Sequence, residues 1–358
     1  MKIPFLSLTP GDDAPDVRAA IDRVVTRGWF VLGPELEAFE QEFAAASGAA
    51  HAVGVGTGTD ALALSLMALG VGAGDEVITS PLSAAYSALA IMMAGARPVF
   101  ADIDPERLTV SPERVERAIT PKTKAILPVH LYGQPADMPA LAEIAARRGL
   151  LLIEDCCQAH LAMATGRPAG TWGAAGAFSF YPTKNLGALG DGGAVITSDA
   201  ALAAKLRRLR NGGQTSRYHH AEFGVNSRLD EMQAAILRAR LPRLAGWTAA
   251  RRARAARYRE RLEGAPVQVP AEYDAGHVYH LFPVLSRDRD ALQARLREAS
   301  IETLIHYPLA IPQQEAMRSV RPAACPVAAR VASEVLSLPL HPALPIEAVD
   351  EVARLMSG

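Results

Sequence analysis

Seven short runs rich in apolar and β-branched residues alternate with helical patterns through the first two-thirds of the chain, and this alternation restricts the fold more than any other feature. The runs are HAVGVG (51–56), DEVITS (75–80), ARPVFADID (96–104), TKAILPVH (123–130), GLLLIED (149–155), GAFSF (176–180) and GGAVITS (192–198). Short strands that alternate with helices are typical of parallel sheets built from crossover connections. We therefore expect a mainly parallel sheet covered by helices on both faces.

Two segments between the runs indicate how the sheet is covered. Residues 60–70 (DALALSLMALG) are apolar nearly all round, which predicts a buried helix that ends at Gly70. Residues 34–48 predict an amphipathic helix that stops at Gly48 and turns four residues toward the core: Leu36, Phe39, Phe43 and Ala46.

The sequence changes character near Pro242, where a long helical segment dense in arginine begins (RLAGWTAARRARAARYRERLEG, 243–264). We interpret it as a solvated helix that joins two domains, because one basic run in a chain of net charge -1 is weak evidence for nucleic-acid binding. The residues after it read as strand, helix, strand and closing helix. We expect a large domain of residues 1–245 and a smaller C-terminal α+β domain of residues 246–358 that includes this helix.

Composition narrows the class of protein. A chain of 358 residues, 49% hydrophobic and close to neutral, can bury a large core and has no general reason to bind nucleic acid or a membrane surface. No apolar run is long enough to span a bilayer, and the N-terminus lacks a signal-peptide pattern. The three cysteines show no disulfide or zinc spacing, so we expect reduced thiols in a soluble, cytoplasmic protein: Cys156, Cys157 and Cys325.

Polar residues follow three of the expected strands, at the position where open parallel sheets bind their ligands. Residues 57–60 (TGTD) open the buried helix, Asp155 ends its run with Gln158 three residues later, and Lys184 follows GAFSF. Each group alone has an ordinary explanation. The TGTD stretch could be a tight turn with a helix cap, Asp155 could be a second helix cap, and Lys184 could be a surface charge. The stretch GTGTD matches neither a Walker loop nor the GxGxxG spacing.

Taken together, these residues match the functional groups of pyridoxal 5'-phosphate (PLP). A helix N-terminus with Gly58 and Thr59 suits a phosphate dianion, and Ser179 adds a hydroxyl. A carboxylate such as Asp155 keeps a pyridine nitrogen protonated, and a buried lysine such as Lys184 forms a Schiff base with an aldehyde. Phosphate, pyridine nitrogen and aldehyde together predict PLP as the cofactor.

The chain also resembles a known family, the DegT-like nucleotide-sugar aminotransferases, which are PLP-dependent transferases of fold type I. Eight blocks carry the resemblance in order: GWFVLGPELEAFEQEFA, GTDAL, PVHLYGQPADM, EDCCQAH, GAFSFYPTKNLGALGDGGA, GVNSRLDEMQAAIL, IHYPL and LSLPLHP. Because they run over nearly the whole chain, the resemblance implies the same fold and an aminotransferase activity.

The resemblance assigns roles to individual residues. It makes Lys184 the Schiff-base lysine and Asp155 the partner of the pyridine nitrogen, with Gln158 against the cofactor ring. It also assigns binding of the cofactor phosphate to three further residues: Gly58, Thr59 and Ser179.

Two positions complete the expected site. Many relatives place an aromatic or histidine ring over the pyridine where this chain has Ala84, so we expect either Tyr86 or something smaller to cover the cofactor. Asn226 matches a family asparagine that reaches across a dimer interface to the cofactor phosphate, and its local alternative is a helix cap. The resemblance implies an obligate homodimer with shared active sites. We expect no metal, because His219, His220 and His306 lack partners at ligand spacing.

The expected function is a PLP-dependent transamination with glutamate as amino donor and a nucleotide-linked keto-deoxysugar as acceptor. The stretch YHHAEFGVNSRLDEMQAA (218–235) looks most like members that act on a dTDP-3-keto-6-deoxyhexose. Amination at C-4 remains an alternative, because fold and family do not determine substrate. Two further alternatives are a sugar dehydratase of the same family, whose members carry histidine in place of Lys184, and a non-catalytic sensor with the same fold.

Overall fold

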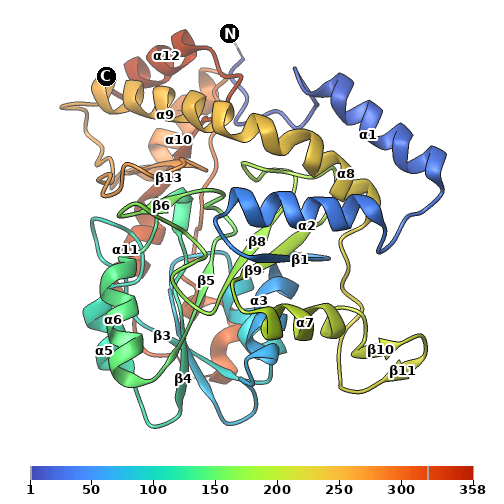
Figure 1. The fold of residues 1–358 in the computed structure, drawn as a ribbon. Coiled ribbons are helices and arrows are strands. Elements are labelled where there is room, and N and C mark those ends of the chain that lie inside the picture. Colours follow the sequence, from blue (N-terminus) through green and yellow to red (C-terminus); the bar gives the residue numbers. More distant parts are fainter. Residues whose placement is uncertain (1, 321, 358) are drawn as a thin grey trace.

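The computed structural model describes residues 2–320 and 322–357, which build a central seven-stranded sheet (Figure 1). In spatial order its strands are β1 (His51–Val55), β9 (Gly193–Thr197), β8 (Ala175–Ser179), β5 (Leu151–Asp155), β4 (Thr123–Leu127), β2 (Glu76–Thr79) and β3 (Arg97–Phe100). Each of the seven predicted runs forms one of these strands. Strand β9 is antiparallel to both neighbours and the other neighbouring pairs are parallel, which confirms the expected mainly parallel sheet.

The antiparallel direction of β9 goes with a connection that contains no helix. Residues 180–192 join β8 to β9 and are assigned to no helix or strand. Parallel neighbours are usually joined by a crossover helix, which this connection lacks. The chain instead turns back at the edge of the sheet where β8 and β5 end, and this turn holds Lys184 on the same edge as Asp155.

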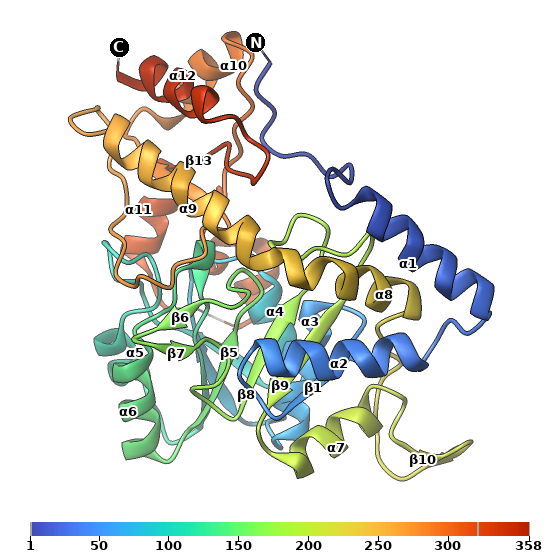
Figure 2. The ribbon, with the colours of Figure 1, turned by 45° about the horizontal axis from the view of Figure 1, so that its top comes forward.

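Helices cover both faces of the sheet (Figure 2). The helices on one face are α3 (Gly58–Ala68), α4 (Tyr86–Met93) and α7 (Ala200–Leu209). The other face packs against α2 (Pro34–Ala46), α5 (Pro112–Ala118), α6 (Met138–Arg148) and α8 (Glu231–Arg240), while α1 (Ala14–Arg27) lies against α8. Neighbouring residues of one strand take opposite faces, as Leu127 packs in the α3 cluster and Ile126 in the α6 cluster.

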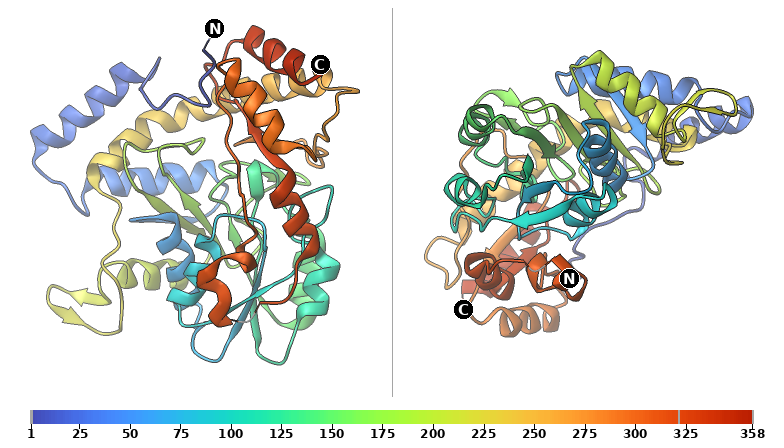
Figure 3. Two further views of the ribbon diagram at one scale, coloured as in Figure 1. Left: turned by 180° about the vertical axis from the view of Figure 1, so that it is seen from behind. Right: turned by 90° about the horizontal axis from the view of Figure 1, so that it is seen from below.

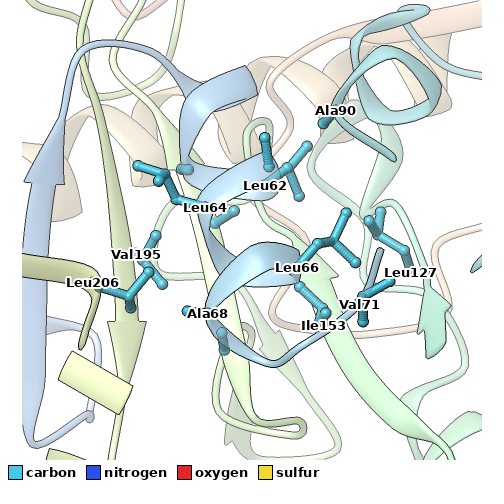
Figure 4. Close-up of a cluster of buried hydrophobic side chains, with 14 of the residues drawn as sticks. Leu62, Leu64, Leu66, Ala68, Val71, Ala90, Leu127, Ile153, Val195 and Leu206 are labelled. Carbon is cyan, nitrogen blue, oxygen red and sulfur yellow. The ribbon is translucent and has the colours of Figure 1, made fainter. Parts of the chain in front are cut away.

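Helix α3 is the buried helix that the sequence predicts. Its leucines contact strand residues of the sheet and α7, as the close-up in Figure 4 shows for Leu62, Leu64 and Leu66. The amphipathic helix α2 differs in one residue from the prediction, since Ala46 is exposed and Ala44 is buried. Ala46 lies at the margin of the apolar stripe in the last turn, where the helix ends.

The C-terminal part has its own small sheet and its own core. Strand β12 (Phe282–Leu285) pairs antiparallel with β13 (Val335–Leu338), flanked by α9 (Leu244–Arg261), α10 (Arg289–Glu298), α11 (Pro326–Glu334) and α12 (Ile346–Ser357). The expected order of strand, helix, strand and closing helix is found, with α11 in addition. Ile3, near the N-terminus, packs in this C-terminal core. The domain division at residue 245 stays a prediction.

Short elements complete the described chain. They are the strand pairs β6 (Met163–Ala164) with β7 (Arg167–Pro168) and β10 (Gln214–Ser216) with β11 (His219–His220), and the short helices η1 (Leu131–Gly133), η2 (Leu241–Arg243), η3 (Ile311–Gln313) and η4 (Glu315–Val320). Across residues 2–320 and 322–357, none of the helices combines the length and the apolar character needed to cross a bilayer.

The arginine-rich helix α9 runs from α8 toward α10 and α12 (Figure 2), and it is solvated only in part, since Arg261 is exposed and Arg251 is buried. Arg254 donates to the carbonyl of Leu344, Arg259 donates to the carbonyl of Pro270, and Arg257 and Arg261 pair with Asp350. These arginines bind acceptors from later segments of the chain, which the helical pattern does not reveal. Their charges hold α9 against the C-terminal part.

Candidate active site

Asp155 is a buried carboxylate at the end of β5, with 5% of its surface exposed. Its Oδ2 accepts from Ser87 Oγ at 2.7 Å and its Oδ1 accepts from the Cys157 backbone N–H at 3.1 Å. Both donors are neutral, and no arginine, lysine or histidine of the described residues forms a salt bridge with Asp155. Buried carboxylates are normally paired with a charged donor. A protonated pyridine nitrogen supplies that donor, so the site fits the group expected there.

Gln158 is fixed by two hydrogen bonds. Its Oε1 accepts from the Tyr132 backbone N–H at 2.7 Å, and its Nε2 donates to the Tyr307 hydroxyl at 3.1 Å. Burial raises the pKa of Tyr307 to about 12, so this hydroxyl stays protonated at neutral pH. Reasoning from individual residues missed Tyr307, although it lies within the IHYPL block.

Lys184 lies half-buried in the turn between β8 and β9, where its backbone N–H donates to the Tyr181 carbonyl at 2.8 Å. Burial lowers the pKa of Lys184, while the nearby Cys157 and Asp155 act in the opposite direction. A lowered pKa increases the neutral, nucleophilic fraction of the amine. The next residue, Asn185, donates to the Val278 carbonyl at 3.0 Å and so anchors the turn.

The N-terminus of α3 provides a cradle for an anion. A Cβ on Gly58 would lie 2.7 Å from Ser179 Cβ and 2.9 Å from Cys157 Sγ, so only glycine fits without displacement. Thr57 Oγ1 accepts from the Asp60 N–H at 3.0 Å, which leaves the first-turn N–H groups of Gly58 and Thr59 for a ligand. The Ser179 hydroxyl lies beside this turn, and the donors suit a phosphate.

Asn226 does not cap a helix. Helix α8 begins five residues later at Glu231, with Asp230 as its N-cap, so the local alternative is wrong. The Asn226 side chain is exposed, and the neighbouring Ser227 donates to Asp60 Oδ2 at 2.7 Å and accepts from the Gly56 N–H at 2.9 Å. These bonds hold Asn226 beside the start of α3 in its own chain and leave its amide exposed.

Tyr86 is the first residue of α4, and 62% of its surface is exposed. Ala84, two residues earlier, is half-buried. The contact of Tyr86 with the cofactor ring stays a prediction.

The described residues contain a buried group with metal-ligand chemistry, formed by His130, Glu154 and Cys156. His130 Nδ1 accepts from the Ala136 N–H at 3.1 Å, so Nε2 carries the proton and donates to Glu154 Oε2 at 3.0 Å. Glu154 also accepts from three backbone N–H groups, those of Gly170, Trp172 and Gly173. Its acceptor capacity is therefore used within the fold, and we interpret the group as a structural network.

Comparison with known proteins decides the family. A family model described as the DegT/DnrJ/EryC1/StrS aminotransferase family matches residues 12–357. The chain belongs to this family. The solved structure of S. venezuelae DesV in complex with a ketimine intermediate has a TM-score of 0.95 and 47% sequence identity, and the match covers 98% of each chain. Membership confirms the predicted fold, the aminotransferase class and PLP as the cofactor.

Three curated relatives of this aminotransferase are similar over nearly their whole length. The dTDP-3-amino-3,4,6-trideoxy-alpha-D-glucose transaminase of Streptomyces venezuelae is 48% identical over 96% of this chain and 92% of its own. The UDP-N-acetyl-3-dehydro-alpha-D-glucosamine 3-aminotransferase of Acidithiobacillus ferrooxidans is 46% identical over 95% of this chain and 93% of its own. The Erythromycin biosynthesis sensory transduction protein EryC1 of Saccharopolyspora erythraea is 48% identical over 100% of both chains.

Proposed function

We propose that this protein transfers the amino group of glutamate to C-3 of a keto-deoxysugar linked to a nucleotide, dTDP in the first instance. The observation that carries the proposal is the meeting of Lys184 and Asp155 at one sheet edge, with burial lowering the pKa of the lysine. Relatives named for 3-amino sugars linked to dTDP and to UDP support C-3 and leave both nucleotides to be tested.

The residues divide the work of binding the cofactor. The N–H groups of Gly58 and Thr59, with the Ser179 hydroxyl, hold its phosphate. Asp155 keeps its ring nitrogen protonated, while Ser87 and the Cys157 N–H orient the Asp155 carboxylate. When bound, PLP withdraws electrons from the reacting carbon of the substrate.

Lys184 has two roles in this scheme. Its amine would hold the cofactor before the donor arrives, because a partly neutral amine can condense with an aldehyde with loss of water. Once displaced, the same amine takes the proton from the donor carbon and returns a proton, as base and then acid. A lowered pKa suits both directions, since proton transfer is most efficient when the catalytic pKa lies near the working pH.

The substrate is tested by product identification. The enzyme is incubated with glutamate and separate 3-keto and 4-keto sugars linked to dTDP or UDP, and the products are identified by mass and NMR. The proposal expects amination of the 3-keto sugars. Turnover of the 4-keto sugars alone would replace C-3 with C-4.

Two other activities make different predictions for the same protein. The name of the EryC1 relative suggests a non-catalytic sensor with the same fold. Such a sensor would bind PLP, and its yellow colour would persist when any amino acid is added. A sugar dehydratase would release a product without nitrogen. The intact Lys184 and Asp155 favour transamination over both.

We also propose a homodimer in which Asn226 of each chain completes the partner's phosphate site. The hairpin β10–β11 projects from the body (Figures 1 and 3), and exposed apolar residues lie on it and on the segment after α1: Trp29, Phe30, Val31, Tyr218 and Phe223. Exposed apolar patches commonly mark interfaces. The cytoplasmic location stays a prediction.

The dimer is tested by solution mass and PLP affinity, measured on wild type and Asn226→Ala. A dimeric wild type and a weaker PLP affinity for the variant are expected. A monomeric wild type with full PLP occupancy would refute the shared site, and unchanged affinity in a dimeric variant would remove Asn226 from it.

A further inference from the structure

One arginine in the described residues is buried without a carboxylate. Arg210, Arg240 and Arg251 all have less than a tenth of their surface exposed. Arg210 pairs with Glu40, and Arg240 pairs with Asp13 at 2.7 Å. Arg251 forms no ion pair with a carboxylate of the described residues and donates to backbone carbonyls instead.

The hydrogen bonds of Arg251 leave part of its guanidinium unused. Its Nη1 donates to the carbonyls of Leu340 at 2.8 Å, His280 at 3.2 Å and Tyr279 at 3.4 Å. Its Nε–H is buried and has no hydrogen-bond partner among the described residues. Burial and the neighbouring Arg254 lower the pKa of Arg251 to about 10, so it is still charged at neutral pH. Burying a charge without a partner costs roughly several kcal/mol of folding free energy, and a bound anion would offset this cost.

Arg251 and Lys184 line the same cavity, of about 290 Å³, between the N-terminal segment, the Lys184 turn and the residues after β13. Its other charges are already paired, Arg240 with Asp13 and Asp12 with Arg243. Burial lowers the pKa values of the three histidines in its wall, so they are neutral at pH 7: His280, His306 and His341. The two cations without a carboxylate partner in the cavity are therefore Lys184 and Arg251.

We propose that Arg251 binds a carboxylate of the amino donor in this cavity, while the donor amine reaches the cofactor at Lys184. The inference rests on the proposed function and adds a donor subsite to it. The cavity lies at the lower end of the size range of small-molecule sites, about 300–1,000 Å³, which suits a five-carbon amino acid better than a whole nucleotide sugar. Guanidinium groups recognise carboxylates through paired hydrogen bonds.

The test uses glutarate, a dicarboxylate without an amine that binds but cannot react. Its dissociation constant is measured by calorimetry on the PLP-loaded wild type, Arg251→Lys and Arg254→Lys, with dTDP titrated in parallel. Lysine keeps the charge but loses the planar fork. Arg254 is the matched control, because it also donates to backbone carbonyls from α9 but does not line the cavity. We expect glutarate to bind Arg251→Lys at least tenfold more weakly, Arg254→Lys unchanged, and dTDP affinity the same in all three.

The inference would be overturned if wild type did not bind glutarate, or if folded Arg251→Lys bound glutarate as tightly as wild type. It would also be overturned if Arg251→Lys lost affinity for dTDP and not for glutarate, since this would assign Arg251 to the diphosphate. If Arg251→Lys does not fold, a crystal structure of wild type with glutarate decides. A carboxylate on the Arg251 guanidinium supports the subsite, and glutarate elsewhere refutes it. A wild type that never reacts with any amino acid would refute the proposed function, whereas these titrations judge Arg251 alone.

Discussion

At the scale of single residues, the chemistry depends on one lysine whose surroundings change its acidity. Burial lowers the pKa of Lys184, and Asp155 and Cys157 limit that fall. Lys184 follows β8 and Asp155 ends β5, so the reactivity of the site depends on two different strand ends. Tyr307 joins the site through Gln158 from a segment more than a hundred residues later in the chain.

Replacing Lys184 with alanine should remove turnover and leave cofactor binding. Gly58, Thr59, Ser179 and Asp155 would still hold PLP, but without covalent attachment or a proton carrier kcat should fall by at least about 10³-fold. Steady-state kinetics and PLP titration measure both quantities. Lys205→Ala is the control, because Lys205 donates to the Ala68 carbonyl outside the site. Wild-type turnover in Lys184→Ala without added amines would end the assignment.

At the scale of elements, the N-terminus of α3 and the turn after β8 must keep their geometry. Glu231 at the start of α8 accepts from the backbone N–H groups of Gly33, Glu35 and Leu36, and so caps α2. Arg240 at the end of α8 donates to the Gly187 carbonyl at 2.6 Å, which fixes the turn that carries Lys184. Helix α8 thus links α2 to the catalytic turn.

Gly58→Ala should weaken PLP binding through crowding at the phosphate cradle. The new Cβ would press on Ser179 and Cys157, with strain of about 1–3 kcal/mol in a packed site. Gly246→Ala is the matched control, since no atom lies within 4 Å of its Cβ position. Fluorescence titration with PLP compares the two variants. Equal affinities would show that the α3 N-terminus is not where the phosphate binds.

Asp13→Asn should destabilise the protein strongly by leaving Arg240 buried without its partner. Breaking a buried pair typically costs about 3–5 kcal/mol. Asp12→Asn is the control, because Asp12 pairs with Arg243 at the surface, where a pair contributes about 0–1 kcal/mol. Urea denaturation measures both changes. A loss for Asp13→Asn no larger than that for Asp12→Asn would mean that the pair does not hold this region.

The sequence predicts elements whose signal is local and misses contacts made between distant segments. All seven strands and α3 were readable from short apolar patterns, and the lysine and aspartate from their places after strands. Two such contacts are the hydrogen bonds from α9 arginines to carbonyls such as that of Leu344 and the cap that Glu231 provides for α2. Their partners lie about 90 to 200 residues apart in the sequence. Periodicity carries no information on such pairs.

At the scale of the whole molecule, buried neutral histidines make stability depend on pH. Burial lowers the pKa of His160 and His277 to about 3 and of His306 and His341 to about 4, from an ordinary value of 6.5. Below pH 6.5 the unfolded chain then binds more protons than the folded one. The free energy of unfolding is therefore greatest above pH 6.5 and falls as the pH is lowered toward these values.

Urea denaturation at pH 7 and pH 5 should show this loss, with His160 contributing about 2 kcal/mol of it. A folded His160→Gln variant, which cannot titrate, should lose correspondingly less stability between the two pH values. An identical loss in variant and wild type would show that His160 is not kept neutral by the fold.

The account rests on Lys184 as the residue that holds the cofactor, and borohydride reduction followed by peptide mass spectrometry tests this most directly. The chain has five lysines: Lys2, Lys122, Lys124, Lys184 and Lys205. Reduction of the PLP-loaded protein should place the cofactor mass on the Lys184 peptide, and glutamate added beforehand should abolish the labelling. Labelling of another lysine instead, or of none while PLP is bound, would contradict the account.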